Sequence, residues 1–118
     1  MLRAYLVILF CLIAIEANGA SGPGATMGAG TFSCAEFAKQ YQKSPEHIDT
    51  TFFYWAQGYM SGMNVILVAL KKPIHDLNAE PINAQQQTIR AFCNERPLAT
   101  FLEAVQNLYE KLPLANSN

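Results

Sequence analysis

The hydrophobic and polar positions of this chain alternate with the period of α-helices, and signals for β-strands are nearly absent. In the segment 31–43, Cys34, Phe37 and Tyr41 are three and four residues apart, which places them on one face of a short predicted helix. Near the C-terminus, four apolar residues recur at spacings of four, three and four: Phe101, Val105, Leu108 and Leu112. This stripe predicts an amphipathic helix that buries one side.

A long helix is predicted between these two. Ser44 is a suitable N-cap, Pro45 suits the first helical position, and Glu46 suits the first turn, where a negative charge meets the positive end of the helix dipole. The helix would run to about Leu70, where two lysines and then Pro73 end it.

Two further helix starts follow a turn-rich loop at 74–81. Asn83 can cap a helix that extends to Cys93, and Asn94 can cap the last helix, with Pro97 in its first turn. We therefore expect an all-α fold, a small bundle of about four helices.

The N-terminal segment is typical of a secretory signal peptide. Arg3 precedes an apolar run that ends at Ile15, and small residues follow at Ala17 and Gly19, as signal peptidase requires. The sequence thus predicts cleavage near Gly19 and a periplasmic or secreted protein. The predicted organisation is a signal peptide at 1–19, a flexible leader at 20–30, a helical domain at 31–112 and a flexible tail at 113–118.

Two cysteines follow the predicted cleavage site, Cys34 and Cys93. In an oxidising, exported compartment, one disulfide between them is the expected pairing. The bridge would close a loop of roughly 60 residues and stabilise the fold by about 4 kcal/mol in the chain-entropy model.

The stretch from Phe52 to Leu70 contains no charged residue and suits three interpretations: a membrane span, the central helix of a bundle, or an aromatic ligand site. At 100° per residue, four polar residues form one narrow strip on this helix: Thr50, Gln57, Ser61 and Asn64. A span would also separate Cys34 from Cys93 across the membrane. We therefore expect the central helix of a bundle and no stable membrane insertion. An aromatic ligand site is the weaker alternative, since aromatic residues at helical spacing usually belong to a core.

Gly58 and Gly62 form a G-x-x-x-G pair in the same helix, which lets another backbone approach closely. Each glycine in a helix interior costs about 1 kcal/mol relative to alanine, so a packing role is expected. The partner is either another helix of the same chain, which is the simpler interpretation, or a second copy in a homodimer.

Candidate chemistry is sparse. The net charge of −1 gives no electrostatic reason to expect nucleic acid or an anionic membrane surface as a partner. His47 and His75 are well separated in sequence, and two cysteines in a bridge leave no set of residues at the spacing of a metal site. Ser61 lies outside any G-x-S-x-G turn. We expect no enzyme, no catalytic residues, no metal and no cofactor.

Three segments resemble the HdeA/HdeB family of small periplasmic acid-stress chaperones: "FSCAEF" at 32–37, "IRAFCNERP" at 89–97 and "FLEAVQNLYEKL" at 101–112. The resemblance implies an ATP-independent holding chaperone that is a folded dimer near neutral pH. Acid would loosen it and expose apolar surface that holds unfolded periplasmic proteins. Under this resemblance Cys34 and Cys93 form the bridge. The candidates for contact with a client or partner are Phe52, Phe53, Trp55 and Tyr59.

A second resemblance concerns "YWAQGYMSGMN" at 54–64 and the late cysteine followed by a proline. Both features are similar to the periplasmic immunity proteins that neutralise type VI secreted amidases. This chain lacks the further cysteines usual in those proteins and the lysine-rich tail of the chaperones. Three functions stay open: an acid-activated chaperone, an immunity protein that binds one secreted amidase toxin, and a structural or accessory subunit.

Overall fold

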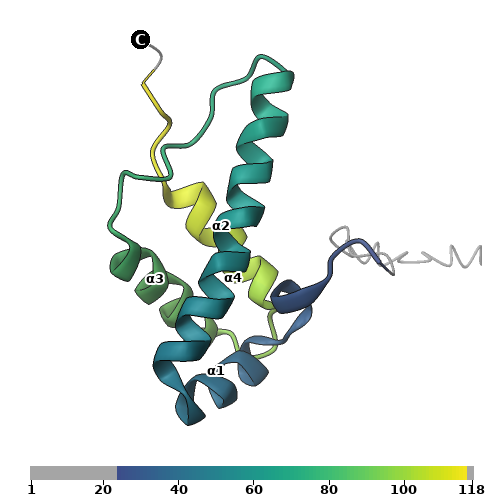
Figure 1. Cartoon of the computed structure of the whole chain (residues 1–118), viewed down its shortest axis with the longest axis vertical. Helices are drawn as coiled ribbons and strands as arrows, with labels where there is room; N and C mark the ends of the chain where they lie inside the picture. Colours follow the sequence, from purple (N-terminus) through teal and green to yellow (C-terminus); the bar gives the residue numbers. More distant parts are fainter. Residues whose placement is uncertain (1–23, 117–118) are drawn as a thin grey trace, which may run out of the picture.

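The computed structural model describes residues 24–116, which form a bundle of helices (Figure 1). Its elements are η1 (Gly28–Thr31, a 3-10 helix), α1 (Cys34–Lys43), α2 (Pro45–Ala69), α3 (Ile82–Glu95) and α4 (Phe101–Lys111). Residues 24–116 contain no strands, only two isolated bridges between backbone segments. The predicted all-α fold with four α-helices is confirmed. The predicted signal peptide at 1–19, the leader residues 20–23 and the tail residues 117–118 lie outside the described range.

Helix α4 holds the bundle together, because it packs against η1, α1, α2 and α3. Its predicted apolar stripe is confirmed, since all four residues are buried: Phe101, Val105, Leu108 and Leu112. Helices α1 and α3 also pack against each other. Helix α2 is the longest, and its last turns extend beyond the other helices (Figure 1).

Two helices begin with a capping box. At α1, the Ser33 hydroxyl accepts a hydrogen bond from the Glu36 N–H (3.1 Å), and the Glu36 carboxylate accepts one from the Ser33 N–H (2.8 Å). Thr100 and Glu103 form the same pair of bonds at α4, at 3.2 and 2.6 Å. Each box satisfies backbone N–H groups that a helix start otherwise leaves without partners.

The predicted limits of α2 are confirmed, whereas those of α3 are displaced. Helix α2 has Ser44 at its N-cap position, although without a side-chain capping bond, and it ends at Ala69. Helix α3 begins at Ile82, one residue before the predicted cap, and it continues two residues past Cys93.

The predicted start of α4 near Pro97 is wrong. Residues 96–99 form a turn, and the helix begins only at Phe101. The reason is a tertiary contact: the carbonyls of Pro97 and Ala99 accept hydrogen bonds from the first N–H groups of α1, at 3.0 and 2.7 Å. The turn therefore caps α1 instead of extending α4.

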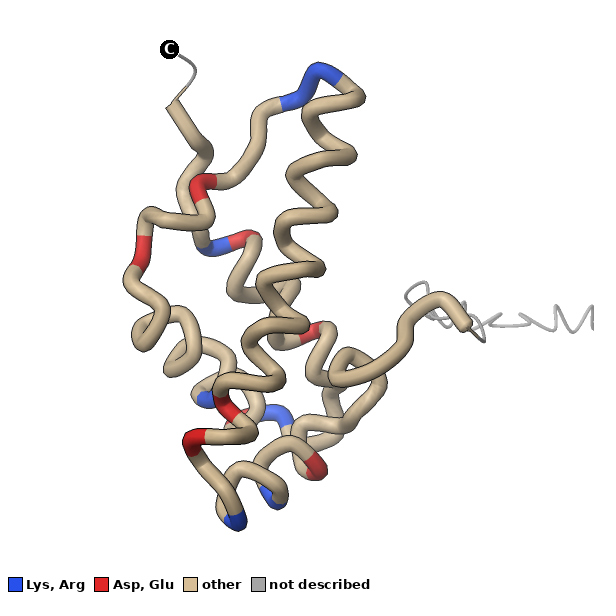
Figure 2. Tube along the Cα trace, in the orientation of Figure 1, with Lys and Arg blue, Asp and Glu red and all other residues tan. Residues whose placement is uncertain are grey.

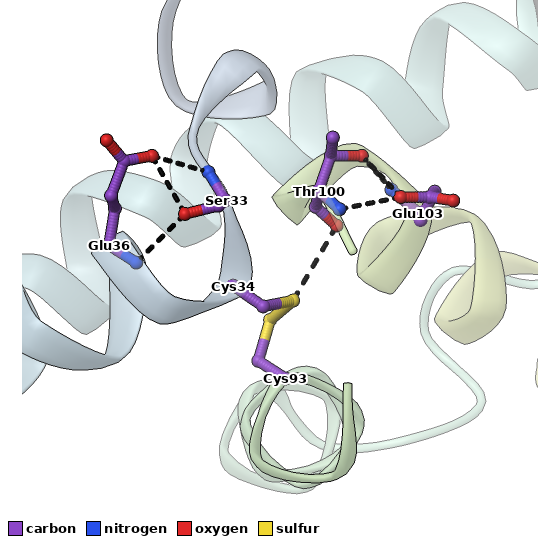
Figure 3. The surroundings of a disulfide bond; sticks show 6 residues. All are labelled: Ser33, Cys34, Glu36, Cys93, Thr100 and Glu103. Atoms are coloured by element: carbon purple, nitrogen blue, oxygen red, sulfur yellow. Dashed lines mark hydrogen bonds between the residues drawn. A yellow bond between two sulfur atoms is a disulfide. The ribbon is translucent and has the colours of Figure 1, made fainter. Parts of the chain in front are cut away.

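The disulfide between Cys34 and Cys93 lies at this junction and confirms the predicted pairing (Figure 3). The two Cα atoms are 4.7 Å apart, and both residues are buried. The sulfur of Cys34 also lies 3.7 Å from the carbonyl oxygen of Thr100, a packing contact, since a disulfide sulfur carries no hydrogen to donate. The bridge thus joins the start of α1 to the last turn of α3, beside the start of α4.

Candidate protein-binding face of helix α2

Two of the four predicted contact residues, Phe52 and Phe53, belong to the core. They are 5% and 4% exposed. The ring of Phe52 lies with its centroid 5.0 Å from those of Phe37 and Phe101, which fixes α2 to α1 and α4. Both side chains would reach a client only if the bundle opened.

Trp55 and Tyr59 are half-buried and stack on each other, with ring centroids 5.8 Å apart and an interplanar angle of 11°. The Trp55 indole N–H donates a hydrogen bond to the Met27 carbonyl (2.8 Å). The Tyr59 hydroxyl accepts one from the Gln106 amide (3.1 Å). Their polar groups therefore already have partners within the chain.

The segment before α1 packs against Trp55, which corrects the prediction of a flexible leader for residues 27–30. A Cβ added at Gly30 would overlap the indole ring, and one at Gly28 would lie 3.3 Å from it. Gly28 also has φ of +74°, a conformation that favours glycine. These two glycines let η1 lie directly on Trp55.

Gly58 and Gly62 face open space, so the expectation that they pack against another helix of the same chain is wrong. No atom elsewhere in the described chain lies within 4 Å of a Cβ built on either residue. Both are exposed, because α1 and η1 cover other parts of α2. The G-x-x-x-G pair therefore has no packing partner within residues 24–116.

The surface around these glycines is apolar, and its large side chains are between 55% and 69% exposed. We call it the α2 face, and its residues are Tyr54, Gly58, Ser61, Gly62, Val65, Ile66, Val68 and Leu70. Large exposed apolar side chains gathered on one helix are a mark of protein–protein interaction sites.

Charged residues lie near the start of α2 and just after its end. Figure 2 shows acidic positions near the start of the helix, lysines just beyond its end, and no charge between them. Glu46, Lys71 and Lys72 are exposed. Asp49 is half-buried and forms an ion pair with Arg90, whose guanidinium also lies 5.3 Å from the centroid of the Tyr41 ring. None of the helices formed by residues 24–116 has the length and apolar character needed to cross a membrane.

Asn64 anchors the loop that follows α2. Its side-chain amide donates to the His75 carbonyl (2.8 Å), and its side-chain oxygen accepts from the His75 N–H (3.1 Å) and from the Tyr109 hydroxyl (2.7 Å). The Nδ1 atom of His75 lies 2.6 Å from the Leu112 carbonyl. Burial raises the pKa of Tyr109, with a smaller contribution from Tyr59, so the phenol keeps the proton that it donates.

Sequence reasoning missed this network and a second one at Gln85. The polar strip of α2 includes Asn64, but the pattern does not indicate that the loop eleven residues later folds back onto this side chain. The buried amide of Gln85 donates to the carbonyls of Leu77 and Glu80, at 2.9 and 2.7 Å, and fixes the other end of the same loop.

Two shallow grooves lie elsewhere on the surface. One, of about 310 Å³, lies between α1 and α3 beside Tyr41 and Arg90. The other, of about 200 Å³, lies between α3 and α4 and is lined by residues of both charges. The side-chain oxygen of Asn107 is buried there without a hydrogen-bond partner. Within residues 24–116, no three His, Cys, Asp or Glu residues are grouped as a metal site requires.

No protein-family model, curated protein or solved structure matches this chain in the comparisons made with each. The candidate site is therefore defined by its own geometry, the exposed uncharged side of the longest helix.

Proposed function

We propose that this protein is a small exported binding protein that holds other periplasmic proteins through the α2 face, as an ATP-independent chaperone. The observation that carries the proposal is the exposure of large apolar side chains on a helix that the disulfide-bridged bundle holds in place. The proposal assigns a binding role and no catalysis.

An uncharged apolar surface suits segments that unfolded proteins expose. Contact between two apolar surfaces removes both from water and needs no matching of specific charges, so one face can hold many sequences. The face also lacks the charged groups whose desolvation would weaken such contacts.

Acid would enlarge the binding surface under this proposal. Hydrogen bonds from the Ser33 backbone and hydroxyl lower the pKa of Glu36 below its ordinary value of 4.5. Because the folded-state pKa is depressed, the capping box contributes stability above that pH and loses it as the pH falls. A weakened start of α1 would uncover part of the Phe37 and Phe52 contact.

A specific partner is the second candidate, in line with an immunity protein that binds one secreted amidase toxin. The observation that favours it is that the α2 face is exposed in the folded chain, so no loosening is needed for binding. A rigid preformed helix loses little conformational entropy on binding, which favours one tight complex.

Light scattering tests the proposal. An aggregation-prone periplasmic protein is taken to about pH 3 and returned to about pH 7, with and without this protein in its oxidised form. We expect scattering to fall when the protein is present, together with an increase in apolar-dye binding to it in acid. Unchanged scattering at every ratio of the two proteins would rule out the chaperone and leave the specific partner.

A further inference from the structure

The end of α2 combines exposed apolar side chains with two lysines. Four large apolar side chains between positions 65 and 70 are 55–68% exposed, and two exposed lysines follow them directly. The last turns also extend beyond the other helices (Figure 1). We call this segment the α2 tip, and its residues are Val65, Ile66, Val68, Leu70, Lys71 and Lys72. We propose that the α2 tip binds the surface of an anionic lipid bilayer. The inference goes beyond the proposed function and does not depend on it.

The apolar side chains of the α2 tip point to different sides of the helix. At 3.6 residues per turn, Ile66 and Val68 lie about 160° apart around the helix axis, and Val65 lies between them. A protein partner that packs on one side of α2 would leave Ile66 or Val68 in water. A fluid lipid surface closes around the end of a helix that enters it and covers both. The distribution of these side chains therefore favours a bilayer over a protein surface.

The two lysines are fixed at the turn that ends the helix. The Lys71 N–H donates a hydrogen bond to the Val68 carbonyl (3.0 Å). The Lys72 N–H donates one to the Leu67 carbonyl (2.9 Å). This bonding pattern usually has glycine at the position of Lys71, whose φ of +55° is unfavourable for other residues. The helix dipole favours cations at this end, but it does not account for the exposed apolar side chains beside them. Contact with lipid phosphates accounts for both.

The local charge of the α2 tip is positive, although the whole chain carries a net charge of −1. The sequence has no Asp or Glu between Asp49 and Asp76. Figure 2 shows both lysines at the end of α2, and no acidic position of residues 24–116 beside them. Lipid phosphates attract cations within a Debye length of the bilayer, about 10 Å at 0.1 M salt. The net charge gives no reason to expect an anionic membrane as a partner, but the charge within this distance of the tip does.

The dimensions of the α2 tip suit shallow contact with the headgroup region. The apolar side of a surface-bound helix enters about 5–10 Å, to the boundary between headgroups and acyl chains. From Val65 to Leu70 the helix rises about 7.5 Å at 1.5 Å per residue, so its apolar part fits this depth. The ammonium groups of Lys71 and Lys72 stand on flexible four-carbon stems, which can turn back to the phosphates while the preceding turn is buried. The proposed contact crosses no bilayer.

Co-sedimentation with lipid vesicles tests the inference. The oxidised protein is mixed with vesicles of phosphatidylcholine alone, or with vesicles in which about a third of the lipid is phosphatidylglycerol, at low and at moderate salt. We expect binding to the anionic vesicles at on the order of 1 mM lipid, weaker binding as salt rises, and little binding to the neutral vesicles. Equal binding to both compositions, or binding to neither, would overturn the proposal.

Charge reversal shows where the vesicle is bound. Lys71→Glu with Lys72→Glu should weaken binding to anionic vesicles at least about tenfold, because the tip then repels the phosphates. The matched control is Lys39→Glu with Lys43→Glu, which makes the same change in net charge at exposed positions of α1. This control should bind like the wild type. Equal losses from both pairs would show attraction by the charge of the whole chain and would contradict a site at the tip.

Removing apolar side chains tests whether the tip enters the lipid. Ile66→Ser with Val68→Ser should weaken binding about tenfold, because less apolar surface leaves water on contact. The matched control is Ile82→Ser with Leu98→Ser, two side chains that are also exposed but lie at the start of α3 and in the turn before α4. Urea unfolding checks that both proteins are folded. Unchanged binding by the first pair would rule out insertion of the tip.

The lysine variants also separate this inference from the proposed function. Reversal of Lys71 and Lys72 leaves the side chains of the α2 face unchanged, so protection of clients should persist when vesicle binding is lost. If the wild type binds anionic vesicles but protects no client, the function fails and the inference stands. If the wild type protects clients but never sediments with vesicles, the inference fails and the function stands.

Discussion

Glycine residues serve two opposite purposes in this chain. Gly28 and Gly30 make room for the indole ring of Trp55, so the ring itself excludes any larger residue there. Gly58 and Gly62 make room for nothing within the described chain. Replacing one residue of each kind distinguishes an internal packing role from a role in binding a partner.

Alanine at these glycines should change stability in opposite directions. Gly58→Ala should raise the free energy of unfolding of the monomer by up to about 1 kcal/mol, because alanine favours the helix and meets no neighbour. Gly30→Ala should lower it by about 1–3 kcal/mol, because its Cβ overlaps Trp55. Urea unfolding at low protein concentration measures both. A destabilising Gly58→Ala would mean that this face is covered within the chain.

Asn64 is the side chain on which the loop after α2 depends. Asn64→Ala leaves the His75 backbone and the Tyr109 hydroxyl without their partners, and should lower the free energy of unfolding by about 1–3 kcal/mol. Asn94→Ala, at an exposed position of α3, is the matched control and should have little effect. Equal losses from both variants would show that the network contributes nothing specific.

The sequence predicts a residue's role only in two cases. Either neighbouring residues carry the signal, or the number of residues of one type leaves a single pairing, as with the cysteines. The Cys34–Cys93 bridge follows from the two cysteines that remain after the predicted cleavage site, and the pairing is confirmed. The contacts of Asn64 and Trp55 join segments 11 and 28 residues apart. No pattern around either residue specifies which distant backbone group will be its partner.

Helix starts show the same division between local and tertiary causes. Helix α1 begins at Cys34, near the start that the spacing of Cys34, Phe37 and Tyr41 predicts, and Pro45 marks the start of α2 as predicted. Helix α4 begins after a capping box at Thr100 and Glu103, past the cap that the sequence predicts at Asn94. The intervening turn is held by α1, and only the fold brings that helix there.

The capping box of α1 should make stability sensitive to acid. The pKa of Glu36 is lowered in the folded state, so the wild type should lose stability as the pH falls below about 4.5. Glu36→Gln keeps a neutral capping group and should show a smaller loss over the same range. Unfolding midpoints measured from neutral pH downward test this. The control is Glu110→Gln, which removes a carboxylate that makes no capping contact. Parallel pH profiles for wild type and Glu36→Gln would exclude this role.

The arrangement of the whole bundle explains why the α2 face is free. Helix α4 contacts every other helix, and the disulfide fixes the ends of α1 and α3 beside it. Helix α2 is the longest of the described helices, and its last turns extend past its neighbours (Figure 1). An apolar helix of this length was predicted from the sequence, but which of its sides would be covered depends on the packing of three other helices.

The most direct test of the central claim is client protection by a variant with a polar α2 face. Val65→Ser with Ile66→Ser removes two exposed apolar side chains, and Leu98→Ser, at a position 95% exposed in the turn before α4, is the matched control. Surface substitutions such as these should leave the fold intact. The account predicts that the double variant loses most of its suppression of light scattering while the control keeps it. Equal protection by both proteins would contradict a binding role for this face.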